Sequence, residues 1–253
     1  MNLLPRIIVI LCVLAAGVVA QDLPLPEPTT PSGPVADSGT KDPIEDLSTP
    51  VKIVLILTAM TVLPAIVMTV TSFTRIIIVL SFVRKALSVQ EMPPNQVLIG
   101  LALFLTLVIM NPVIGEVNDK ALQPYLNEQI GLKEATDHAA RSLSGFLLGQ
   151  TRDEDLVLMV DITRIEKPKV ASDVPLHVLV PAFALSELRT AFQMGFLVYL
   201  PFLIVDLVVA SVLLSMGMFM LPPVIISTPF KILLFILVDG WDLVVRALVT
   251  SFQ

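Results

Sequence analysis

Charged side chains interrupt the long apolar stretches of this sequence, and they are the first candidates for chemistry. Those that lie within or beside apolar runs are Arg75, Asp206, Lys231, Asp239 and Asp242. An unpaired charge that faces lipid costs on the order of 3 kcal/mol or more, so these side chains should face protein or water. For Asp239 and Asp242 an alternative stays open, in which each side chain extends to a membrane–water interface.

Pairing with an opposite charge would remove most of this cost. Glu187 precedes the third apolar stretch and is a candidate partner for Lys231 in the fourth, either within one chain or between neighbouring copies. Arg75 and Lys231 lie farther from polar sequence, and we expect them to be paired. We therefore predict that Arg75 and Asp206 are buried charges.

The sequence lacks the motifs that would turn these charges into a catalytic centre. It contains no HExxH, no P-loop, no GxSxG and no glycine-rich dinucleotide turn. Asp239 and Asp242 are a carboxylate pair such as an intramembrane aspartyl protease would need, but the GxGD pattern is missing. We predict a protein that is not an enzyme and that binds no cofactor and no metal.

A second candidate is the methionine-rich turn between the last two apolar stretches. It contains Met216, Met218, Phe219 and Met220. Thioethers are flexible and polarizable, so a ring of them could close around polypeptides of different shape. Gly217 and Pro222–Pro223 predict a tight re-entrant backbone, which at membrane depth must be buried in protein or line a cavity. The alternative is that methionine simply fills space at a hairpin tip.

The elements that position these residues are apolar helices. Hydrophobic residues make up 55% of the sequence and charged residues 15%, and the mean hydropathy is +0.86. The apolar stretches are Ile53–Val83, Val97–Gly115, Met194–Met216 and Leu221–Val238. We predict an all-α fold with two long hydrophobic helical hairpins, residues 51–115 and 181–253, flanking a small periplasmic helical domain at residues 116–180.

Local signals predict how these elements begin, bend and end. As one helix the first stretch would be roughly 45 Å long, which exceeds a bilayer core of roughly 30 Å. Pro64 lacks a backbone donor and is the expected kink. Arg84 and Lys85 lie at the hairpin tip, on the cytoplasmic side by the positive-inside rule. Thr151 and Glu154 have the spacing of a capping box.

The first fifty residues predict export. Residues 1–20 combine Arg6, an apolar run and small residues before Gln21, which is typical of a cleavable signal peptide; an uncleaved anchor is the alternative. Residues 21–50 contain seven prolines, six acidic residues and one lysine, and we predict a disordered acidic tether. The single cysteine, Cys12, lies in the apolar run, so the mature chain would have no disulfide.

Several long strings occur in an order and spacing that resemble a known family. They are Phe73–Phe82, Pro93–Thr106, Pro181–Phe183, Ser186–Gln193, Pro229–Lys231 and Val238–Trp241. The resemblance is to the FliP/SctR family of type III secretion export-gate proteins, and it covers roughly residues 50 to 250. The signal peptide and acidic tether favour the flagellar branch over the needle-injectisome branch.

The resemblance implies a homopentameric ring that joins FliQ and FliR, with FlhB nearby, in the flagellar basal body. Unfolded flagellar proteins would pass through this gate across the bacterial inner membrane, on whose periplasmic side it lies. The family's pore gasket matches Met216, Met218, Phe219 and Met220, where Phe219 departs from three consecutive methionines. Its inter-subunit salt bridge matches Glu187 and Lys231. The intramembrane charges alone would also fit a polytopic transporter of a small solute or ion, although no internal repeat is evident.

Overall fold

The computed structural model describes residues 49–89, 92–164, 174–218 and 220–252. All regular structure in these ranges is helical, which confirms the all-α prediction for this part of the chain. The predicted signal peptide, and the tether as far as Ser48, lie outside the described residues. The chain forms two compact units, residues 1–67 and 68–253, which we describe separately.

The first apolar stretch forms two helices, α2 (Thr49–Val70) and α3 (Phe73–Ala86). We expected the chain to bend at Pro64, but α2 continues through Pro64, and the helical structure is interrupted at Thr71–Ser72. The Thr71 hydroxyl accepts a hydrogen bond from the Phe73 backbone N–H at 3.4 Å. Hydroxyl side chains compete with helical hydrogen bonds in this way, which favours the interruption at this position.

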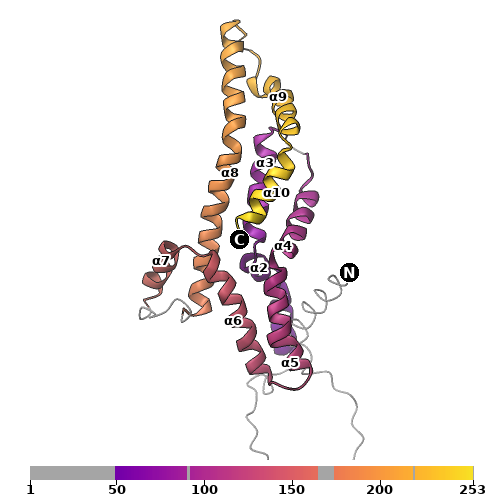
Figure 1. The fold of residues 1–253 in the computed structure, drawn as a ribbon, viewed down its shortest axis with the longest axis vertical. Helices are drawn as coiled ribbons and strands as arrows, with labels where there is room; N and C mark the ends of the chain where they lie inside the picture. The colour runs from indigo at the N-terminus through magenta and orange to yellow at the C-terminus, as the bar shows by residue number, and fades with distance from the viewer. Residues whose placement is uncertain (1–48, 90–91, 165–173, 219, 253) are drawn as a thin grey trace, which may run out of the picture. The chain divides into compact units, whose positions relative to one another are not determined.

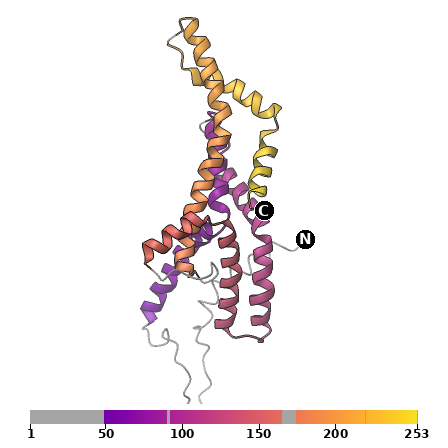
Figure 2. The ribbon, with the colours of Figure 1, turned by 60° about the vertical axis from the view of Figure 1, so that its left-hand side comes forward.

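The second unit is built around one long helix, α8 (Leu176–Ser215), which is about 60 Å long at the standard helical rise. Figure 1 and Figure 2 show α3 beside α8, and α6 and α7 against its first half. The remaining elements are α4 (Asn95–Val117), the π-helical turn η1 (Asn118–Leu122), α5 (Gln123–Leu126), α6 (Leu132–Gln150), α7 (Asp153–Thr163), α9 (Pro223–Leu237) and α10 (Gly240–Thr250).

Among the described residues, two helical segments are long and apolar enough to cross a membrane. They are Asn95–Leu126, which runs from α4 through α5, and α8. A third is present if Met60–Val70 and Phe73–Ala86 count as one broken span. The chain thus has the two to three long apolar helices of a membrane protein, in agreement with its composition.

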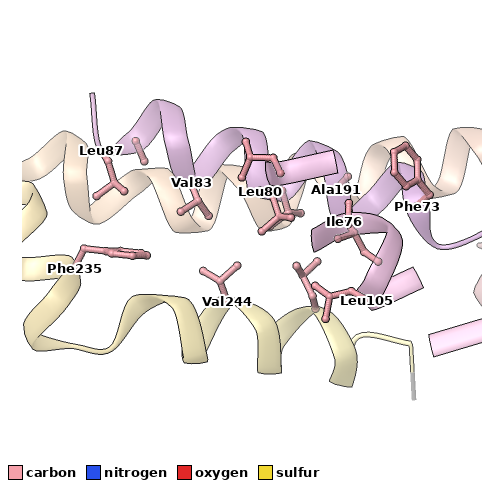
Figure 3. Close-up of a cluster of buried hydrophobic side chains, with 14 of the residues drawn as sticks. Phe73, Ile76, Leu80, Val83, Leu87, Leu105, Ala191, Phe235 and Val244 are labelled. Carbon is pink, nitrogen blue, oxygen red and sulfur yellow. The ribbon is translucent and has the colours of Figure 1, made fainter. Parts of the chain in front are cut away.

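The larger core cluster gathers around α3, as Figure 3 shows. Ile76, Leu80 and Val83 are fully buried at the spacing of one helical face. They pack with side chains from α4, α8, α9 and α10, including Leu98, Ala102, Leu105, Ala191, Phe202, Phe235, Val244 and Leu248. A Cβ atom at Gly195 of α8 would lie only 2.5 Å from Cδ2 of Phe82, so this glycine permits the close approach of α3 and α8.

A second core cluster joins α6 and α7 to the first half of α8. Its buried members are Val70, Leu147, Val160, Val174, Val178, Leu179 and Phe183. The polar middle of the sequence, predicted as residues 116–180, therefore packs on α8, which itself begins inside that range at Leu176.

The predicted capping box at the start of α7 is wrong. Helix α7 begins one residue later than the box requires, with Arg152 at the N-cap and no side-chain hydrogen bond capping it. The Thr151 hydroxyl instead donates to the Leu147 carbonyl of α6 at 2.7 Å. The Glu154 carboxylate accepts a hydrogen bond from Arg189 at 3.0 Å.

Candidate functional site

The methionine-rich turn between α8 and α9 has a defined backbone where it leaves α8 and where it enters α9. Gly217 adopts a left-handed conformation with φ of +74°. Its N–H donates to the Leu214 carbonyl, and the Met218 N–H donates to the Leu213 carbonyl, each at 3.0 Å. This is the Schellman arrangement that ends helices at glycine. Pro223 then begins α9 at a position where its missing N–H costs nothing.

The described methionine side chains of this turn are exposed, although Gly217 and Pro223 fix the backbone at its two ends. Met216 is 68% exposed, Met218 39% and Met220 95%. Phe219, the fourth predicted gasket residue, lies outside the described residues. The described thioethers are therefore available for contact with another molecule.

Arg75 and Glu187 form a buried ion pair between α3 and α8. Arg75 is 2% exposed and Glu187 fully buried. The Arg75 Nε donates to Oε2 of Glu187 at 2.8 Å, and Nη2 donates to Oε1, so the pair is bidentate. A two-pronged contact of this kind fixes the relative orientation of both side chains.

The remaining Arg75 donors bind polar groups from two other segments. Nη1 donates to the backbone carbonyl and hydroxyl of Ser251, at 2.8 and 3.0 Å, and Nη2 also donates to Oε1 of Gln150 at 3.2 Å. The Phe252 ring lies 3.8 Å from Cζ. A guanidinium has five N–H donors, and the contacts match all five. We call Arg75, Glu187, Gln150, Ser251 and Phe252 the Arg75 centre.

Lys231 and Asp206 form a second ion pair, between α9 and α8. Lys231 is 1% exposed, and its Nζ donates to Oδ2 of Asp206 at 2.6 Å and to the Ser88 hydroxyl at 2.7 Å. The Ser227 hydroxyl donates to the other Asp206 oxygen. The Asp206 side chain is 25% exposed, so this pair is less deeply buried than the Arg75 centre.

The structure places the predicted charges in pairs, with partners that the sequence had not indicated. Glu187 pairs with Arg75 and Lys231 pairs with Asp206, and Glu187 and Lys231 do not pair within one chain. The predicted bridge between neighbouring copies stays a prediction. Gln150, Ser251 and Ser88 were missed, because a single polar residue far away in sequence carries no periodic signal.

The remaining two carboxylates lie at a helix boundary. Asp239 adopts a left-handed conformation between α9 and α10, with φ of +52°. Asp242 lies in the first turn of α10 and accepts a hydrogen bond from Nε of Arg246 at 2.5 Å, and both side chains are exposed. This hydrogen bond lowers the pKa of Asp242. A carboxylate held ionised by a surface arginine does not resemble a protease acid–base pair.

Together these features define a membrane protein of apolar helices whose buried charges bind one another. Residues 56–248 match the model of the FliP family. The chain is 55% identical over 213 residues to the flagellar biosynthetic protein FliP of Bacillus subtilis, covering 84% of this chain and 96% of that protein. It is 44% identical over 243 residues to the protein of the same name from Aquifex aeolicus, covering 95% and 97%.

A third relative, from Pectobacterium carotovorum, is 51% identical over 202 residues, which cover 80% of this chain and 78% of that protein. The chain therefore belongs to the FliP family, a non-enzymatic component of the flagellar biosynthetic export apparatus. The resemblance found in the sequence is confirmed. Its membrane helices and its family indicate the inner membrane and the flagellar basal body.

Proposed function

We propose that this chain is the pore-forming subunit of the flagellar type III secretion export gate, which passes unfolded flagellar proteins across the inner membrane. The observation that carries this proposal is the set of exposed thioethers on the α8–α9 turn, which follows the Schellman arrangement at Gly217. Copies of the chain form a homopentamer with FliQ and FliR, with FlhB nearby, on the periplasmic side of the membrane. Family membership supports this assembly.

The gasket of this gate consists of Met216, Met218, Phe219 and Met220 from each copy. Unbranched thioether side chains have several accessible rotamers and no hydrogen bonds to satisfy, so they can pack against one another or against a passing chain. The fixed backbone at Gly217 and Pro223 holds their attachment points while the side chains move. No covalent bond is made or broken, because the work consists of closing and opening a passage.

The exposed apolar side chains of α8 and α9 provide the contacts for assembly. They include Phe196, Leu197, Leu207, Val212, Ile225, Phe230, Ile236 and Leu237. Where such a side chain would otherwise face water, its burial contributes about 1.5–3 kcal/mol. Within lipid the gain comes from close packing of the helices instead. Lipid and the partner subunits cover the faces that neighbouring copies leave open.

A Glu187–Lys231 bridge between neighbouring copies is the finer part of the proposal. Within one chain Glu187 is fully buried against Arg75, and Lys231 is bound to Asp206 and Ser88. A carboxylate has about four acceptor sites, so Glu187 can keep Arg75 while it accepts a further donor. The bridge nevertheless requires local rearrangement at assembly, because neither group is accessible from outside the chain.

Deletion of the gene tests the proposal as a whole. Loss of filaments and motility, with solute uptake intact and restored by the gene in trans, is the expected result. Loss of uptake with normal filaments would contradict the gate and would favour a solute transporter.

A further inference from the structure

We propose that Ser251 and Phe252, the residues that follow α10, act as a latch that holds α10 and the attached α9 against α3. This inference concerns the single chain and goes beyond the proposed function. It rests on the contacts of the Arg75 centre, in which the two residues of the latch supply acceptors and an aromatic face to a buried guanidinium.

Side chains from two helices, α3 and α6, bind the latch. Nη1 of Arg75 donates both to the Ser251 carbonyl and to its hydroxyl, and the Phe252 ring stacks 3.8 Å from the guanidinium carbon. From α6, Nε2 of Gln150 donates to the Phe252 carbonyl at 3.2 Å. Gln150 also accepts from Arg75, so it ties the latch to the same guanidinium a second time.

Without the latch, α10 has a small buried face. Val244 and Leu248 are its buried apolar side chains, and Val245 and Val249 are partly buried against the larger core cluster, whereas Trp241, Asp242 and Leu243 are exposed. Figure 3 shows Val244 pointing from α10 toward Val83 of α3. Short elements with few buried contacts open at lower free energy than the core around them. The Ser251–Phe252 contacts therefore decide whether α10 stays closed.

The latch can open while the base of the molecule stays intact. Glu187 remains bonded to Nε and Nη2 of Arg75 when Ser251 leaves Nη1, so the buried charge keeps its counter-ion. The pairing of α3 with α8 is thus conserved in the open state. Because α9 connects the methionine turn to α10, release of the latch frees the returning arm of that turn.

Maleimide labelling of single cysteines, introduced into the full chain in isolated membranes, measures how often α10 opens. Replacing Cys12 with serine removes the only cysteine of the sequence, so each reporter is then the single thiol. Val244→Cys probes the buried face of α10, and Ala247→Cys, on its exposed side, corrects for reagent access. Val178→Cys, fully buried in the second core cluster, reports the rest of the fold.

Phe252→Ala should raise maleimide labelling at Val244→Cys by about tenfold relative to Ala247→Cys. We expect this increase because the variant lowers the free energy needed to open α10 locally. Phe252→Tyr, which keeps the ring, should leave labelling unchanged, and Val178→Cys should stay protected in both. If Phe252→Ala does not accumulate, Gln150→Leu decides the test, because it removes the shared tie to Arg75 and Phe252.

Protection of Val244→Cys in both Phe252→Ala and Gln150→Leu would overturn the latch. Parallel exposure of Val178→Cys would also overturn it, because the two residues would then stabilise the fold as a whole. Neither result bears on the export gate, since Phe252 and Gln150 are not part of the proposed gasket.

Discussion

The Arg75 centre holds its side chains in one geometry, whereas the methionine turn constrains its backbone and leaves its side chains exposed. In the Arg75 centre the side chains are fixed: Arg75 and Glu187 are almost inaccessible, and their contacts are directional. In the turn the backbone is fixed by Gly217, whereas Met216 and Met220 are exposed and need no hydrogen bonds. One region therefore specifies a single geometry, and the other region keeps its side chains adaptable.

This difference separates folding from function within one chain. Substitutions in the buried centres should reduce the amount of folded protein, because they leave charges without partners. Substitutions in the methionine turn should leave folding intact and alter what the assembled complex allows to pass. The variants below test that distinction, beginning with those expected to change stability most.

Glu187→Gln should give the largest loss of stability. It leaves the Arg75 guanidinium buried without a counter-charge, which costs about 3–5 kcal/mol. Thermal unfolding of the detergent-extracted protein measures the loss. The double variant Arg75→Met with Glu187→Met should be more stable than Glu187→Gln, because no charge is left unpaired. Parent-like stability of Glu187→Gln would show that the pair contributes nothing.

Lys231→Met should cost less, about 2–3 kcal/mol, because the partner left behind, Asp206, is partly exposed to solvent. Charge exchange then distinguishes the two partners proposed for Lys231. Lys231→Glu with Asp206→Lys should restore folding of the single chain but not the ring on native gels, because the new carboxylate at position 231 would face Glu187 of the neighbouring copy. If this double variant formed the ring at the parent level, the bridge between copies would be wrong.

Gly195→Ala should destabilise the protein by about 1–2 kcal/mol through overpacking against Phe82. A change of rotamer can move the Phe82 ring, but the Phe82 Cβ would still lie 3.0 Å from the added methyl group, so the relief is incomplete. Gly100→Ala in α4 is the matched control, since nothing lies within 4 Å of its added methyl group. Equal unfolding midpoints for the two variants would show that α3 and α8 are not closely packed there.

Asp242→Asn should have the smallest effect. The hydrogen bond from Arg246 lowers the pKa of Asp242, so any stability it contributes is present above the ordinary aspartate pKa and is lost as the pH falls through the lowered value. Because both groups are exposed, we expect equal unfolding midpoints for variant and parent at neutral and at acidic pH. A large loss at neutral pH alone would show a structural role for this pair.

The sequence predicted the elements that depend on local composition. Apolar runs gave the long helices, and Gly217 with Pro222–Pro223 gave the turn between α8 and α9. The interruption at Thr71–Ser72 was not predicted, because proline is ordinarily a stronger helix-breaking signal than two hydroxyls. The capping box was wrong because α7 begins one residue later than its spacing required, with Arg152 at the N-cap.

The partners of the charged residues could not be predicted in the same way. Gln150 and Ser251 lie 75 and 176 positions from Arg75 in the sequence, so their contact exists only once α3, α6 and α10 have packed. The sequence indicated that Arg75 and Lys231 needed partners, because an unpaired charge in an apolar stretch is costly. Which carboxylate each would find depended on tertiary packing.

The permeability of cells that carry alanine at Met218, Phe219 and Met220 shows whether this turn seals the passage. We expect the assembled complex to form at the parent level and ions to leak during export. Ile162→Ala on α7, which is 62% exposed and lies outside both the turn and the proposed assembly contacts, should cause no leak. Unchanged permeability in the triple variant, with the complex fully assembled, would contradict the claim that this turn seals the passage.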